Sequence, residues 1–161
     1  MTKVASILIA VIAVTNTFAL AQSNAQKAFA TLKDMPGTWQ GTSPEGPVKV
    51  TFKVTGGGSA IISEIFGKED MISMFHMDGD RLLLTHYCSA GNQPRMAASV
   101  SPDGKTFTFT YVDATNLSAP DAGHMQQMIL TVVDQNHHTE EWIFADHGHE
   151  HRVTFDLHRT V

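Results

Sequence analysis

The stretch LTHYCSAGNQPRM contains the only cysteine of the chain, two residues after a histidine and seven before an arginine. His86 and Cys88 are residue types that occur in catalytic Cys/His pairs and in metal sites. A thiol nucleophile needs a base within hydrogen-bond reach, whereas residues two apart on a strand are separated by about 7 Å. We therefore interpret Cys88 as a small buried residue that is not a nucleophile, and His86 as a hydrogen-bonded interior residue.

A second cluster of reactive types is the segment DHGHEHRV near the end of the chain. His149 and His151 alternate along the last expected strand, and a His-x-His pair on a strand resembles the ligand spacing of carbonic anhydrase and cupin metal sites. His86 and His124 are candidates for a third zinc or iron ligand. The alternative is a solvated turn in which the histidines only add polarity, since the chain has nine of them.

The segment HHTEEWIF places a carboxylate among aromatic residues. On a strand, Trp142 and Phe144 share a face with Glu140, so we expect Glu140 to point toward the interior. A buried carboxylate is costly unless it is paired, and its expected partner is Arg95, Arg81 or a histidine. The direction of Arg95 is left open by the pattern, because a neighbouring proline interrupts strand pairing there.

The elements that carry these residues follow from the spacing of apolar residues. A capping box at residues 23–26 and apolar positions recurring at helical spacing predict one short helix, which ends at Pro36-Gly37. Beyond it, apolar and polar residues alternate, most clearly in PVKVTFKV, as in half-buried strands. Ten strands are predicted, over residues 39–42, 47–54, 59–66, 70–77, 81–88, 94–100, 105–112, 124–133, 138–145 and 150–159.

Ten antiparallel strands in a meander leave exposed edges unless the sheet closes on itself. We therefore predict an all-β fold, a ten-stranded antiparallel up-and-down β-barrel with a short N-terminal helix. Successive turns fall at alternate ends of such a barrel. Tight turns rich in Gly, Asn and Asp share one end with the helix, and the longer connections gather at the other, which predicts an open mouth over a ligand cavity. These connections are residues 43–46, 67–68, 89–93, 113–123 and 146–148.

The triplet Gly37-Thr38-Trp39, which opens the first strand after a short helix, resembles the Gly-x-Trp signature of lipocalins and their calycin relatives. That resemblance implies an arginine of the last strand lying over the tryptophan, a part that Arg159 could play. Ten strands are closer to fatty-acid-binding proteins or to the haem-binding nitrobindin type than to the eight of lipocalins. The nitrobindin resemblance implies His151 or His158 as the iron ligand. The chain is also similar to exported bacterial proteins of unassigned function with THYC…GNQPRM and HHTEEW segments.

The start of the chain predicts export. Residues 1–21 have the charge, apolar core and small-residue cleavage site of a signal peptide, which leaves one domain over residues 22–161 in a secreted or periplasmic protein. We expect no membrane span after cleavage and no internal disulfide. The net charge of −5 argues against nucleic acid as a partner. The expected state is a monomer.

The sequence therefore predicts an exported barrel that binds a small, largely apolar molecule through its mouth. The candidate ligand-binding residues are His86, Cys88, Arg95, His124, Glu140 and Trp142. No cofactor is predicted in this interpretation; zinc or haem belongs to the alternative, a metal or haem protein using His149 and His151. A third hypothesis is a hydrolase or isomerase built on His86, Arg95 and Glu140, although no Gly-x-Ser-x-Gly nucleophile elbow is present.

Overall fold

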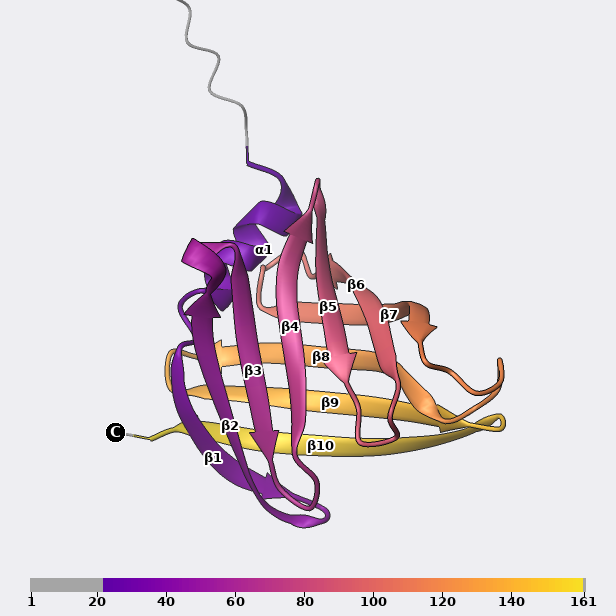
Figure 1. Ribbon diagram of the computed structural model, residues 1–161. Helices are drawn as coiled ribbons and strands as arrows, with labels where there is room; N and C mark the ends of the chain where they lie inside the picture. The colour runs from indigo at the N-terminus through magenta and orange to yellow at the C-terminus, as the bar shows by residue number, and fades with distance from the viewer. Residues whose placement is uncertain (1–21, 161) are drawn as a thin grey trace, which may run out of the picture.

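The computed structural model describes residues 22–160 of the protein (Figure 1). The predicted signal peptide, residues 1–21, lies outside the described residues. Within them, no helix has the length and apolar character needed to cross a membrane. The elements are α1 (Asn24–Leu32), β1 (Gly37–Ser43), β2 (Gly46–Thr55), the single 3-10 turn η1 (Gly56–Gly58), β3 (Ala60–Phe66), β4 (Met71–Asp78), β5 (Arg81–Tyr87), β6 (Gln93–Val100), β7 (Thr106–Thr115), β8 (His124–Asp134), β9 (His137–Asp146) and β10 (His149–Arg159).

The ten strands form a closed antiparallel barrel in which each strand pairs with its neighbours in sequence and β1 pairs with β10. The predicted fold class is therefore confirmed. In β2, the alternation that predicted a strand places Val48, Val50 and Phe52 in the core, while Lys49 and Lys53 point to solvent. The same two-residue period fills the interior from every side of the barrel.

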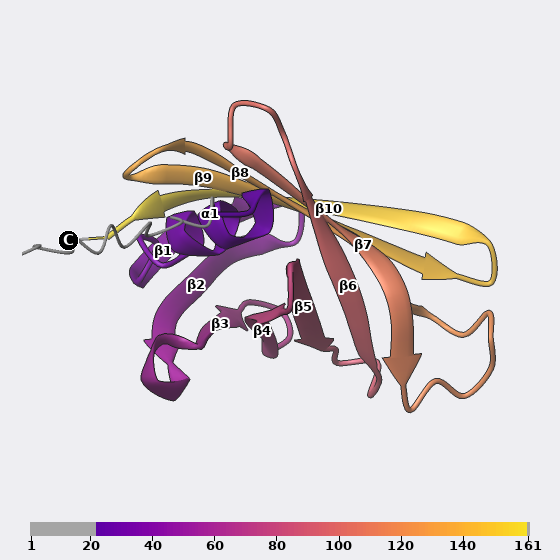
Figure 2. The ribbon, with the colours of Figure 1, turned by 90° about the horizontal axis from the view of Figure 1, so that it is seen from above.

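The helix α1 begins at a capping box, as predicted, with Ser23 and Gln26 each accepting from the backbone of the other. Its apolar face buries Phe29 and Leu32 against the strands, and Leu32 is fully inaccessible. In Figures 1 and 2, α1 lies over one end of the barrel. Phe29 and Leu32 of α1 belong to the apolar core cluster of the barrel.

The seam between β1 and β10 closes the barrel beside α1. The Trp39 indole donates to the Met35 carbonyl at 3.0 Å, and the Arg159 guanidinium lies 4.2 Å from the centre of the Trp39 ring. Arg159 also donates to the Pro36 carbonyl at 2.6 Å, which ties the last strand to the segment after α1. This is the arrangement that the Gly-x-Trp triplet predicted. At Gly41, β1 and β10 lie so close together that a Cβ atom there would be 1.7 Å from the Asp156 carbonyl oxygen.

Candidate functional site

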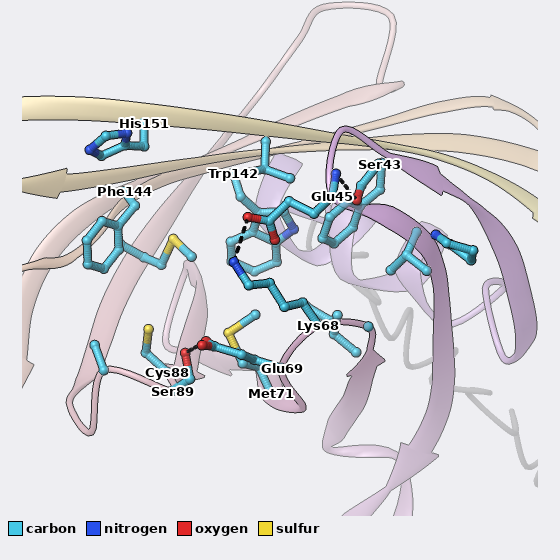
Figure 3. A pocket seen from close by; sticks show the side chains of 18 residues that line it. Ser43, Glu45, Lys68, Glu69, Met71, Cys88, Ser89, Trp142, Phe144 and His151 are labelled. Atoms are coloured by element: carbon cyan, nitrogen blue, oxygen red, sulfur yellow. Dashed lines mark hydrogen bonds and ion pairs between the residues drawn. The ribbon is translucent and has the colours of Figure 1, made fainter.

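The end opposite α1 holds a cavity of about 450 Å³ (Figure 3). Side chains at its rim come from the connections β1–β2, β3–β4 and β5–β6, three of the connections that the sequence assigned to an open mouth. The volume lies within the range of about 300–1,000 Å³ typical of small-molecule sites. Its walls are mainly apolar and include Val48, Ile65, Met71, Trp142, Phe144 and Phe155.

Charged groups stand only at the rim of this cavity. Lys68 Nζ lies 3.6 Å from Glu45 Oε1, and both side chains are largely exposed. Glu69 accepts a hydrogen bond from the Ser89 hydroxyl on the neighbouring connection (Figure 3). These rim residues were not among the predicted site residues. Their place in the connections at the predicted mouth was the one signal that could have indicated them.

Two of the predicted ligand-binding residues, Trp142 and Cys88, line the cavity. In Figure 3 they belong to different sides of it, Trp142 on β9 and Cys88 just after β5. Partial burial is the main reason why the pKa of the Cys88 thiol is raised. A raised pKa lowers the thiolate fraction at neutral pH, which agrees with Cys88 as a wall residue rather than an activated nucleophile.

His86 lies deeper than Cys88 on the same face of β5 and is fully buried. Its Nδ1 shares a 2.9 Å hydrogen bond with the Ser73 hydroxyl, and its ring packs on Trp142 with 4.8 Å between ring centres. Its Nε2 has no hydrogen-bond partner among the described residues. Burial lowers the pKa of His86 to about 4, because the charged imidazolium would lose its hydration. His86 is thus a neutral polar group directly behind the cavity wall.

Glu140 is also buried, and its carboxylate connects the cavity wall to the closed end. Trp142 Nε1 donates to Glu140 Oε2 at 3.0 Å, and His138 Nε2 lies 3.3 Å from Glu140 Oε1. The His138 ring in turn meets Trp39 edge-on, with 4.3 Å between ring centres. Of the three partners expected for Glu140, the structure therefore shows a histidine, His138. The Trp142 indole is a second hydrogen-bond donor to the same carboxylate. Glu140 supports Trp142 from behind and does not itself line the cavity.

Arg95 does not join these residues. It points outward and forms a bidentate ion pair with Asp113 on the exposed surface of β6 and β7. Ordinary strand alternation places Pro94 and Met96 inside and Arg95 outside. The register shift lies on β7, where the extra residue Val112 is exposed and Asp113 pairs with Arg95. The hypothesis that His86, Arg95 and Glu140 form one enzyme site is therefore wrong in its placement of Arg95, which lies on the outer surface.

His124, predicted to lie at the mouth, is a buried structural residue at the start of β8. Its Nδ1 donates to the Ala122 carbonyl at 2.6 Å, and its Nε2 accepts from Gln126 at 2.7 Å. Both ring nitrogens are thus used within the protein, and the Tyr111 ring packs on the imidazole. His124 is not among the residues that line the cavity.

The two histidines of the predicted metal site, His149 and His151, differ in their relation to the cavity. His151 lines the cavity, whereas His149 is exposed and does not line it. Among the described residues, one group of three metal-binding side chains converges, and it contains neither His149 nor His151. His86 and His124, the candidates for a third ligand, are not part of such a group with His149 and His151.

Together these features define a closed ten-stranded barrel with one open end and an apolar cavity. No family model matches the chain, and no curated protein matches it. Among solved structures, it is similar to Rv2717c of Mycobacterium tuberculosis, with a TM-score of 0.55 and 16% identity over 83% of this chain and 98% of that one.

A second similar structure is a Nostoc punctiforme protein of unknown function from the DUF3598 family, with a TM-score of 0.53 and 11% identity. The match covers 81% of this chain and 49% of that protein, so the chain spans about half of its length. At these identities both likenesses concern the fold alone.

Proposed function

We propose that the protein is an exported binding protein for a small, largely apolar molecule that enters through the open end of the barrel. The observation that carries this proposal is the cavity of about 450 Å³, with apolar walls and charged groups at the rim. Export rests on the signal-peptide pattern of residues 1–21. The Trp39–Arg159 contact supports a relation to calycins, whose members bind small molecules in such barrels.

The wall chemistry favours an amphipathic ligand. Its apolar body would contact Met71, Trp142 and Phe155, where desolvation is favourable by roughly 25 cal/mol per Å² of buried apolar surface. A polar end would remain near Lys68 and Glu45, whose exposed ion pair contributes little stability and can open at low cost. Methionine suits this role because its unbranched side chain adapts to different ligand shapes.

The test uses two neighbouring residues of β4 that point in opposite directions. Met71 lines the cavity, whereas Ile72 is 38% exposed on the outer surface. The purified protein should give saturable fluorescence enhancement with anilinonaphthalene sulfonate. Met71→Trp should fill part of the cavity and reduce the affinity for the dye by more than about tenfold, roughly 1.4 kcal/mol. The matched variant Ile72→Trp should bind the dye like the parent.

Equal loss in both variants, or no effect of either, would contradict binding in this cavity. Thermal melts of both variants establish that the fold is retained before any dye is added. Native mass spectrometry of protein purified from its own host would then identify a retained organic molecule by its mass.

Haem is the second candidate, because His151 is the one histidine among the cavity-lining residues and apolar side chains surround it. One imidazole suits haem iron, which takes a single proximal histidine in globins and peroxidases, whereas zinc sites require three or four protein ligands. Titration with hemin, followed by absorbance, tests this alternative. Loss of the histidine-ligated spectrum in His151→Ala but not in His149→Ala would support it, and identical spectra in both variants would exclude His151 as the ligand.

A further inference from the structure

A separate group of ligand-type side chains lies on the outer surface at the closed end of the barrel. His137 at the start of β9 and His158 near the end of β10 are directly opposite each other in the antiparallel pair. Asp156 lies two residues before His158 and therefore points to the same side of β10. These three positions share one outward face, and none of them lines the cavity.

The ligand atoms of the three side chains already converge. His137 Nε2 lies 2.6 Å and His158 Nε2 lies 3.7 Å from the same oxygen, Asp156 Oδ1, and one ligand atom from each residue lies within 4.8 Å of the others. Ligands of a tetrahedral zinc ion with bonds of about 2.0–2.1 Å are separated by roughly 3.3 Å. Relative shifts of up to about 1.5 Å between these side chains would bring the atoms to that spacing.

The two imidazoles are stacked, with 4.3 Å between ring centres and an interplanar angle of 19°. Asp134, the strand partner of His137 on β8, adds a second carboxylate beside the group. Negative charge and imidazole nitrogen are thus concentrated in one shallow hollow of the surface.

We propose that His137, Asp156 and His158 form a surface site for a divalent transition-metal ion of the zinc and copper class. Two imidazoles and one carboxylate are a ligand set of metal sites that keep open positions, which water would fill here. The site is distinct from the predicted pair His149 and His151, which lies at the other end of β10. It is also independent of the cavity, so its failure would leave the proposed ligand-binding function untouched.

Isothermal titration of the chelator-treated protein with zinc chloride tests the site. We expect one saturable site per chain. His158→Ala should weaken zinc binding by more than the roughly 10–100-fold that loss of an outer-shell partner costs, and Asp156→Asn should weaken it less. His149→Ala, which removes another exposed histidine of β10, is the matched control and should bind like the parent.

The three variants alter exposed side chains, so circular dichroism melts should match that of the parent. Electron paramagnetic resonance of bound Cu²⁺ gives a second readout, since nitrogen hyperfine structure from two imidazoles should be reduced in His158→Ala. Absence of saturable zinc binding to the parent, or unchanged binding in His158→Ala, would overturn the proposal. Loss of binding in His149→Ala alone would do so too, by moving the site to the opposite end.

Discussion

The two ends of the barrel use the same strands for opposite purposes. At the closed end, Leu32 and Trp39 are almost fully buried, and Arg159 donates hydrogen bonds to backbone carbonyls of the segment after α1. At the open end, the ion pair of Glu45 with Lys68 is exposed, and the apolar walls below it enclose a cavity. The helix and its apolar contacts cover one end, whereas the other end encloses an apolar cavity.

This contrast distinguishes the residues that stabilise the fold from those that would bind a ligand. Buried apolar contacts and satisfied backbone groups make up most of the free energy of folding, whereas exposed ion pairs contribute about 0–1 kcal/mol. Substitutions at the closed end should therefore change stability, and those at the rim should change ligand binding. Between the ends lie His86 and Glu140, whose substitution should affect both properties.

The largest effect is expected for Trp39→Ala. The substitution removes an indole that packs on His138 and Arg159 and leaves the Met35 carbonyl without its donor. Truncation of a buried aromatic residue costs about 3–5 kcal/mol, a large part of the stability of a small domain. Urea unfolding followed by circular dichroism should show this loss.

The fraction of Trp39→Ala that remains folded should bind anilinonaphthalene sulfonate at the cavity with the affinity of the parent. Reduced dye affinity together with unchanged stability would reverse the assignment of the two ends.

The second effect is a decrease in the free energy of unfolding at acid pH. Because the pKa of folded His86 is about 4, against about 6.5 for an unperturbed histidine, the unfolded chain takes up a proton there between these pH values while the folded protein does not. The free energy of unfolding should therefore decrease as pH falls from about 6.5 to about 4, by about 3 kcal/mol in total. Below about pH 4 both states are protonated, and this contribution becomes constant.

His86→Gln isolates that contribution, because glutamine does not titrate and can still bond to Ser73. Urea unfolding at several pH values should give a flatter acid limb for this variant than for the parent. Equal slopes would show that His86 is protonated within the folded barrel. Dye titration at the same pH values would reveal whether charge behind Trp142 alters the cavity.

A loss of similar size is expected at Glu140. Glu140→Ala leaves the buried donors of Trp142 and His138 without their acceptor, and each such group costs about 1–3 kcal/mol. Glu140→Gln preserves the shape and one acceptor oxygen, so it should be the milder change in thermal melts. Dye affinity should fall in Glu140→Ala as well, since the Trp142 ring loses its anchor. Equal melting temperatures for the alanine and glutamine variants would contradict this account.

Much of the fold could be predicted because apolar and polar residues alternate along a strand in the same order as buried and exposed positions. Val48, Val50 and Phe52 are spaced by the pleat itself, and the Gly-x-Trp triplet correctly indicated the contact of Trp39 with Arg159. The direction of Arg95 was left open because of the neighbouring Pro94, although the alternation through Met96 places Arg95 outside. The extra residue on β7 opposite this point has no distinct sequence signal.

The surface group of His137 and His158 shows a different limit. Which residues face each other across β9 and β10 depends on the hairpin register, and this is set by the turn at His147 and Gly148, both with positive φ. The sequence predicts a three-residue connection, residues 146–148, which leaves the pairing undefined. A two-residue turn would have placed His137 opposite His158. The cavity itself depends on side-chain packing between distant strands, which local patterns do not encode.

The smallest expected effect lies at the open end, where the long connection after β7 meets the β9–β10 turn. His147 Nδ1 is 2.9 Å from Asp121 Oδ2, and this bond, with the charge of Asp121, raises the pKa of the exposed imidazole. A raised histidine pKa stabilises the contact at low pH, and the benefit is lost as pH rises through that pKa. Asp121→Asn should lower the pKa of His147 toward its ordinary value in an NMR titration, with no measurable change in melting temperature because both groups are solvated. A clear drop in melting temperature would show that the open end contributes to stability. It would contradict the conclusion that stability depends mainly on the closed end.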